Sequence, residues 1–289
     1  MSEVTVSLDD RVRLVTAVLA ASHWPELEQQ QTPHAVHPHS KQTAYLVEPA
    51  ARHPAVTILN QGLAQNIPLS DYFSAALRCS WPGFTPREPL PTTLADRAWI
   101  NALPDFYQQT DLATFWQKEG EPWQTAYNEL RAIFQDSHLP TFLRQLCGEA
   151  WARVVVVPTV VYPLLKPVLA ETAAALYMIL PPAKAWGESP PWPFGEDPGW
   201  VIAQSCFHLV QHFLADTLAQ MDETQQGLLT YAAVTLCLEK EFDEAEAMTY
   251  LVQKKKEQKL PRLPLAVETL RDYLAEPNGR TLLDLPLGQ

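Results

Sequence analysis

The first half of the chain alternates apolar and polar positions mainly with a helical period. Apolar residues recur three and four positions apart, which places them on one face of a helix. In the segment 9–21, for example, Val12, Val15 and Leu19 share a face. The pattern predicts helices at 9–21, 69–77, 94–106, 110–118, 123–134 and 139–148. Another apolar stretch begins at His53 and stops at 60–62.

The pattern changes after residue 152. Residues 153–157 are dense in valine and end at Pro158, which predicts a buried strand. The apolar segment 174–180 predicts a partner strand that ends at a pair of prolines. A short sheet is therefore expected next to the helix that follows.

That helix is predicted over 200–221 and is apolar on more than one side, as expected for a helix inside a fold. Asp197 and Pro198 precede it as an N-cap carboxylate and a first-turn proline. Further helices are predicted at 228–242, 243–256 and 265–274. The fold class expected from these elements is α+β and helix-dominated. Its expected division is a helical N-terminal lobe, 1–150, and a second lobe, 151–289, or one integrated domain.

Composition limits which classes of molecule the chain can bind as its main partner. The 289 residues carry a formal net charge of −12, which argues against nucleic acid or an anionic membrane surface as the main partner. No uncharged apolar run is long enough to span a membrane, and the first residues do not fit a secretory signal. The four cysteines form no C-x-x-C pair. We therefore expect a soluble, cytoplasmic protein, with its oligomeric state open.

Two histidines in the segment 200–221 carry the main chemical hypothesis. His208 and His212 are four residues apart, so both leave the same face of the helix. One helix presents two imidazoles to a zinc ion with this spacing. Asp216 follows four residues later on the same face, as a third ligand, an acceptor behind the ligands or a solvated residue. The alternative is that both histidines are core residues bonded to protein partners.

The general base of a zinc hydrolase is missing from this motif. In H-E-x-x-H the base follows the first histidine, where this chain has Leu209. In the inverted motif H-x-x-E-H the base would stand at Gln211. Neither side chain can accept a proton from a metal-bound water. Three more histidines, His34, His37 and His39, lie in a proline-containing stretch that favours a mobile surface loop over a metal site.

The order of elements resembles the gluzincin branch of zinc metallopeptidases: a strand pair, a His-x3-His helix and then a helix with glutamates. The segments RVRLVTAVLAAS, RHPAVTILNQG and RVVVVPTVVYPLL also resemble an uncharacterised family of bacterial metallopeptidases with a helical N-terminal half. The resemblance implies a zincin-like core and a third zinc ligand on the later helix, at Glu239 or Glu241. It also implies that the strand 174–180 lies at the sheet edge and pairs with extended peptide.

Three functions follow as hypotheses. The first is a metallopeptidase-like protein without its catalytic glutamate, a pseudo-enzyme that retains zinc or a groove for a peptide or protein partner. The second is an active zinc hydrolase with another base, for which the chain offers Glu188, Glu196, Asp216, Glu223 and Glu239. The third is a metal-free helical interaction protein in which His208 and His212 are core residues.

Overall fold

The structure is a computed structural model that describes residues 4–148, 153–161, 166–183, 193–276 and 279–287. Its contacts divide the chain into two compact units, each discontinuous in sequence. The sheet unit comprises the described residues within 4–135 and 153–196, and the helical unit comprises those within 136–152 and 197–289. The predicted class, α+β with helices dominant, is confirmed.

The sheet unit contains a mixed sheet in the order β1-β2-β4-β3. β1 (Val4–Val6) pairs in parallel with β2 (Val154–Pro158), and β2 pairs in parallel with β4 (Leu176–Leu180). β3 (Val168–Glu171) is antiparallel to β4. Every residue of β2 is buried, as is typical of a strand covered on both faces. The predicted pairing of the two apolar segments is therefore confirmed.

The expectation that 174–180 forms a peptide-binding sheet edge is wrong. β4 lies inside the sheet, because β3 occupies its second side. The outer side of β3 is bonded to α5 (Leu69–Leu77): Ser74 Oγ accepts from the Glu171 amide at 2.9 Å, and Arg78 Nε donates to the Glu171 carbonyl at 3.0 Å. The sequence could not show this order because β3, which directly follows Pro167, is too short to carry an alternating pattern.

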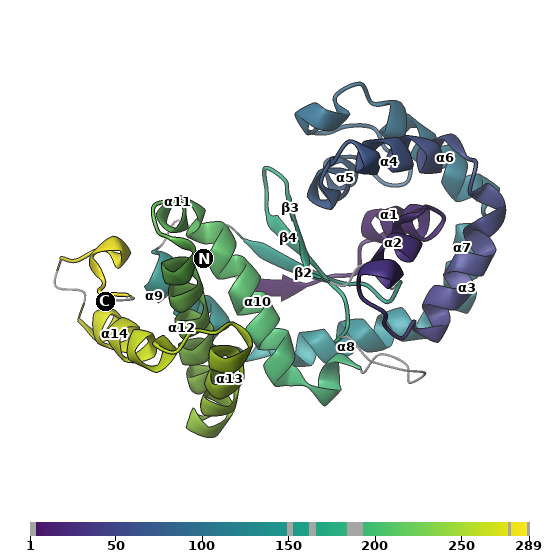
Figure 1. The fold of residues 1–289 in the computed structure, drawn as a ribbon. Coiled ribbons are helices and arrows are strands. Elements are labelled where there is room, and N and C mark those ends of the chain that lie inside the picture. The colour runs from purple at the N-terminus through teal and green to yellow at the C-terminus, as the bar shows by residue number, and fades with distance from the viewer. Residues whose placement is uncertain (1–3, 149–152, 162–165, 184–192, 277–278, 288–289) are drawn as a thin grey trace. The chain divides into compact units, whose positions relative to one another are not determined.

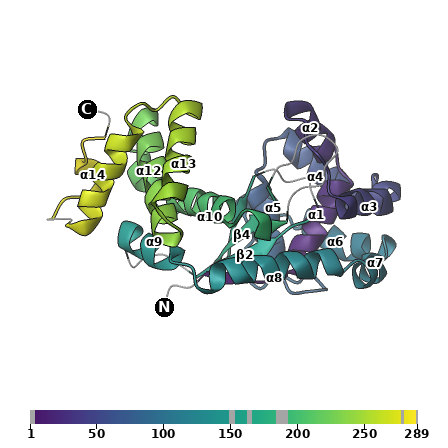
Figure 2. The same cartoon turned by 90° about the horizontal axis from the view of Figure 1, so that it is seen from below.

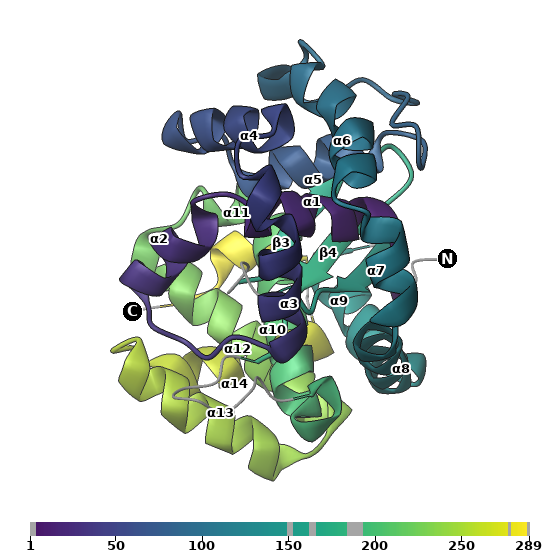
Figure 3. The same cartoon turned by 90° about the vertical axis from the view of Figure 1, so that its right-hand side faces the viewer.

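Eight α-helices are described in the sheet unit. α1 lies among α3, α4, α5 and α6, so its buried side chains join those helices into one core (Figure 1, Figure 3). α8 runs along β1 and β2 (Figure 2). Their bounds are α1 Asp10–Ala20, α2 Trp24–Gln31, α3 Pro38–Val47, α4 Pro54–Ala64, α5 Leu69–Leu77, α6 Ala98–Gln109, α7 Leu112–Lys118 and α8 Glu121–Gln135.

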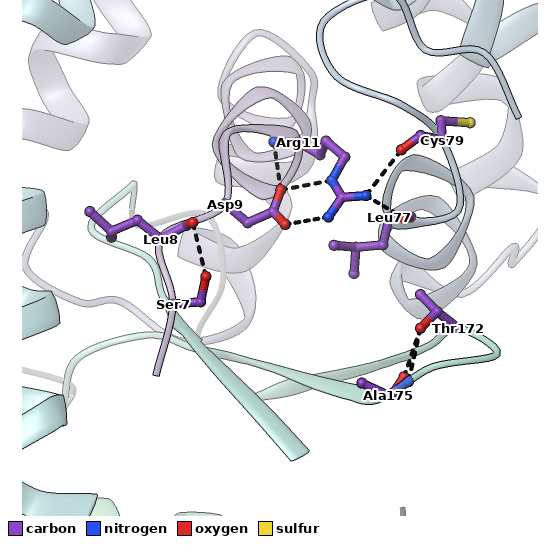
Figure 4. Close-up of polar contacts among 8 residues, drawn as sticks. All are labelled: Ser7, Leu8, Asp9, Arg11, Leu77, Cys79, Thr172 and Ala175. Atoms are coloured by element: carbon purple, nitrogen blue, oxygen red, sulfur yellow. Dashed lines mark hydrogen bonds and ion pairs between the residues drawn. The ribbon is translucent and has the colours of Figure 1, made fainter. Parts of the chain in front are cut away.

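A charged pair at the start of α1 ties this helix to α5. Asp9 caps α1 by accepting the Arg11 backbone N–H, and it also pairs with the Arg11 guanidinium at 2.6 Å (Figure 4). The same guanidinium donates to the carbonyl oxygens of Leu77 and Cys79, at 2.6 and 3.0 Å (Figure 4). Carbonyls at a helix end have no partner within the helix, so Arg11 satisfies the Leu77 carbonyl at the end of α5 and that of Cys79 just beyond it.

The helical unit is organised around α12 (Glu223–Glu241), which contacts α9, α10, α13 and α14. Ten of the eleven residues from Leu228 to Leu238 in α12 are buried, Tyr231 being the exception, which is consistent with a helix surrounded by others. An Asp222–Gln225 capping box opens it. The other helices are α9 Leu139–Cys147, α10 Pro198–Phe213, α11 Ala215–Leu218, α13 Glu244–Glu257 and α14 Leu263–Ala275.

The helix predicted over 200–221 is shorter than expected. α10 ends at Phe213, because Leu214 leaves helical geometry at φ −103° and ψ 16°, and the short α11 follows. Leu214 and Leu218 are both buried by this change of direction, so tertiary packing overrides the continuous apolar pattern. Asp216 consequently lies in another helix than His212, and the expected shared face is wrong.

Candidate functional site

The histidine helix begins as the sequence predicts. The Asp197 side chain accepts the Trp200 backbone N–H at 2.8 Å, and Pro198 occupies the first helical position. His208 and His212 are both half-buried, and each ring meets a neighbouring phenylalanine edge-on. Leu209 is fully buried, whereas Gln211 is exposed. The helix therefore presents two imidazoles, while the position of the usual base faces the core.

Glu239, the third ligand implied by the resemblance, has a different partner. Its carboxylate accepts a hydrogen bond from Arg271 of α14 at 2.6 Å, and Arg271 also bonds Glu268. The Glu268 and Glu239 carboxylates raise the pKa of Arg271, although partial burial opposes them. Glu239 lines a groove formed by α12, α13 and α14. It therefore forms part of a three-residue charge cluster on that side of α12.

The alternative ligand Glu241 is also engaged. Its carboxylate accepts from the Ser137 hydroxyl at 3.1 Å and from the His138 backbone N–H at 2.6 Å, ahead of α9. Across the described residues, no three His, Cys, Asp or Glu side chains gather closely enough to hold a metal ion. The structure brings His208 and His212 together on one helix and supplies no third ligand beside them among those residues.

The candidate replacement bases are dispersed. Glu196 lies in a short 3-10 helix of the sheet unit, and Asp216 lies in α11. Glu223 lines a polar pocket together with Phe207 and Gln211. Neither His208 nor His212 is among the described residues that line this pocket. Glu188 lies outside the described residues.

Thiols of the helical unit lie close together, but burial keeps two of them protonated. Cys206 of α10 and Cys237 of α12 are both buried, and the two thiols interact. Burial raises the pKa of the Cys206 thiol well above its usual value, and the Cys237 thiol raises it further. Burial also raises the pKa of Cys147 to about 12. Because the thiolate is the reactive form, the raised pKa values of Cys206 and Cys147 argue against a catalytic role for these two thiols.

The sheet unit contains a groove that sequence reasoning missed. It has a volume of about 280 Å³, close to the lower limit for ligand sites. Val160 and Pro182, which follow β2 and β4, form part of it, so it lies at the carboxyl ends of two parallel strands. Ligands of open parallel sheets commonly bind there. The other lining residues are His37, Glu121, Pro122, Thr125, Ala126, Glu129, Pro193 and Phe194.

The groove combines apolar walls with two carboxylates. Val160, Ala126 and Phe194 are almost fully buried and form its apolar surface. Glu121 and Glu129 are eight residues apart on α8, and neither pairs with a cation in the described part of the chain. Within the described residues, the Glu129 carboxylate accepts a long hydrogen bond, 3.4 Å, from the Gly195 amide. An apolar body that carries one positive charge would complement this surface.

The histidine-rich stretch forms the support of the groove. His37 lines the groove and caps α3 by accepting the His39 backbone N–H at 3.1 Å, while burial lowers the pKa of His37. The His39 ring is buried, stacks on Phe115 and accepts the Trp123 indole N–H at 2.8 Å. The expectation of a mobile surface loop is therefore wrong for His39, which joins α3 to α8.

Comparison with protein-family models, curated proteins and solved structures finds no match to this chain. Among the residues that the structure describes, no helix is both long and apolar enough to cross a membrane.

Proposed function

We propose that this chain is a metallopeptidase-like protein that does not hydrolyse peptides and instead binds a peptide segment with a basic side chain. The zincin-like core and the gluzincin resemblance are part of this proposal, supported by the order of strand pair, histidine helix and glutamate-bearing helix. The observation that carries the binding function is the groove at the carboxyl ends of β2 and β4, with two carboxylates that form no salt bridge among the described residues.

The loss of hydrolysis is supported by the residues of the histidine helix. Leu209 and Gln211 cannot serve as a general base, and Glu239 is bonded to Arg271. A catalytic zinc site needs three protein ligands. With Glu239 held by Arg271, these residues do not fit a catalytic zinc, and the proposal contains no zinc-dependent step.

Zinc binding at His208 and His212 stays a prediction of the sequence. Elemental mass spectrometry of the freshly purified chain and of a His208→Ala/His212→Ala variant tests it. About one zinc per chain that is lost in the variant would establish the site. Equal metal content in both proteins would contradict it.

The binding proposal favours a lysine or arginine side chain for a physical reason. The aliphatic stem of such a side chain can cover apolar wall while its charged end stays near the carboxylates at the rim. The matching probes are two capped tripeptides, leucine–lysine–leucine and leucine–norleucine–leucine, which differ in charge but hardly in shape. We expect the lysine peptide to bind at least about tenfold more tightly, equivalent to about 1.4 kcal/mol.

Isothermal titration with both peptides tests the proposal. We expect Glu121→Gln and Glu129→Gln each to remove most of the lysine preference, and added salt to weaken it. Glu26→Gln is the matched control, because Glu26 is an exposed carboxylate of the same unit outside the groove. A preference that survives both groove variants would refute the groove as the site. Mass spectrometry of the recovered peptide, in zinc-supplemented buffer, would refute the non-hydrolytic assignment if it showed cleavage lost in His208→Ala.

A further inference from the structure

Two exposed apolar side chains line one groove of the helical unit. Four large hydrophobic residues between 242 and 265 are at least two-fifths exposed: Phe242 43%, Met248 48%, Val252 57% and Leu265 56%. Met248 and Val252 are one turn apart on α13, and both line the groove of about 320 Å³ between α13 and α14. Exposed apolar side chains that line a recess commonly belong to an interaction site.

The two ends of this face of α13 carry charges of opposite sign. Glu244 and Lys255 lie on the same side of α13 as Met248 and Val252, four residues before the first and three after the second. Both are exposed, and neither takes part in a salt bridge within the described residues. The neighbouring Lys254, by contrast, is bonded to Glu257 at 2.7 Å. The helix thus presents an unpaired acid, two apolar residues and an unpaired base in a row.

We propose that this face binds a second copy of the chain, with the two α13 helices antiparallel about a twofold axis. A twofold interface requires a surface that is complementary to itself. With the axis at residue 250, Met248 of one copy meets Val252 of the other. At 1.5 Å per residue, Glu244 lies about 9 Å to one side of the axis and Lys255 about 7.5 Å to the other. Each acid therefore lies opposite a base of the second copy, and the contact forms two ion pairs.

A second copy fits this face better than a partner of one charge sign. A strongly basic partner would be repelled at the Lys255 end, and a strongly acidic one at the Glu244 end. The antiparallel copy satisfies both ends at once and covers Met248 and Val252. The groove between α13 and α14 supplies a recess for the apolar side chains of the other copy. This inference does not depend on the proposed peptide-binding function.

Sedimentation velocity of the full-length chain at about 100 µM tests the interface, because dimer formation depends on concentration. We expect the wild type to sediment with twice the 32.5 kDa chain mass. Val252→Lys places two charges at the centre of the interface and should leave a monomer. The matched control is Gln253→Lys, which adds the same charge to the next position of α13, outside this groove, and should leave the dimer intact.

A charge exchange separates the proposed pairing from a loss of folding. Glu244→Lys should weaken the dimer at least about tenfold, because like charges then face each other. Glu244→Lys/Lys255→Glu should restore it, since the exchanged charges pair again across the axis. A monomeric wild type would overturn the proposal, and so would a dimer that Val252→Lys leaves unchanged. Failure of the double variant to recover dimerisation would overturn the antiparallel arrangement.

Discussion

Replacing Gly62 with alanine should destabilise the protein by about 3 kcal/mol or more, although glycine-to-alanine substitution inside a helix usually stabilises by up to about 1 kcal/mol. Gly62 lies in the interior of α4 and is buried. A β-carbon at this position would collide with the hydroxyl of Tyr72 and lie 3.1 Å from the Ile67 side chain. Tyr72 is fully buried and stacks edge-on against Trp99, so it cannot move aside without disturbing the core.

The collision can be separated from other effects of the substitution. In a Tyr72→Phe background the colliding oxygen is absent, so the cost of Gly62→Ala should fall by at least about 1 kcal/mol. Tyr72→Phe alone should cost little, because the hydroxyl is buried without a hydrogen-bond partner in the described residues. Gly227→Ala in α12 is the helical control, where a β-carbon would meet only the end of the Leu260 side chain. Equal unfolding midpoints for Gly62→Ala and Gly227→Ala in urea would contradict the close approach.

Acidification should remove about 3 kcal/mol of stability between pH 6.5 and pH 4 through His39 alone. Burial lowers the pKa of His39 from 6.5 to about 4, and His37 and Arg13 lower it further. The His39 Nε2 atom accepts the Trp123 indole N–H, so a proton there would place two donors face to face. Because the folded pKa is the lower one, this stability is fully present above pH 6.5. It is lost as the pH falls toward 4.

Unfolding free energies at several pH values, for the wild type and for His39→Gln, measure this contribution. Glutamine keeps an acceptor for Trp123 but does not titrate. The stability of the His39→Gln variant should therefore fall less than that of the wild type between pH 6.5 and pH 4. A proton NMR titration of the His39 ring provides a direct second measurement, with an expected pKa of about 4. A ring that titrates near 6.5, or an unchanged slope in His39→Gln, would contradict the role given to burial.

Local sequence patterns predicted most helices and the two inner strands of the sheet, but not its two outer strands. Residues 69–77 form α5 as expected, and Asp197 and Pro198 open α10 as expected. β1 and β3 were not predicted, because three- and four-residue strands are too short to show an alternating pattern. The apolar stretch expected to stop at 60–62 continues to Ala64, since Gly62 serves a close approach rather than a helix end.

The candidate sites show the same division between local and long-range information. The pairing of His208 and His212 on one helical face depends only on helical spacing and could be predicted. The bond between Glu239 and Arg271 joins residues of two helices, and nothing in the spacing of either segment indicates it. The groove likewise depends on the parallel pairing of β2 and β4, which places Val160 and Pro182 together at the carboxyl ends of these strands. A pattern within a single segment does not contain such pairings.

We propose that a basic peptide binds in the groove beside α8. Methyl NMR spectra of Ala126 and Val160, which both line the groove, report on this binding during titration with the lysine and norleucine tripeptides. We predict that both methyl signals shift and saturate with the lysine peptide, and that Glu129→Gln largely abolishes the shift. Unchanged Ala126 and Val160 signals, or equal shifts with the uncharged norleucine peptide, would contradict the claim.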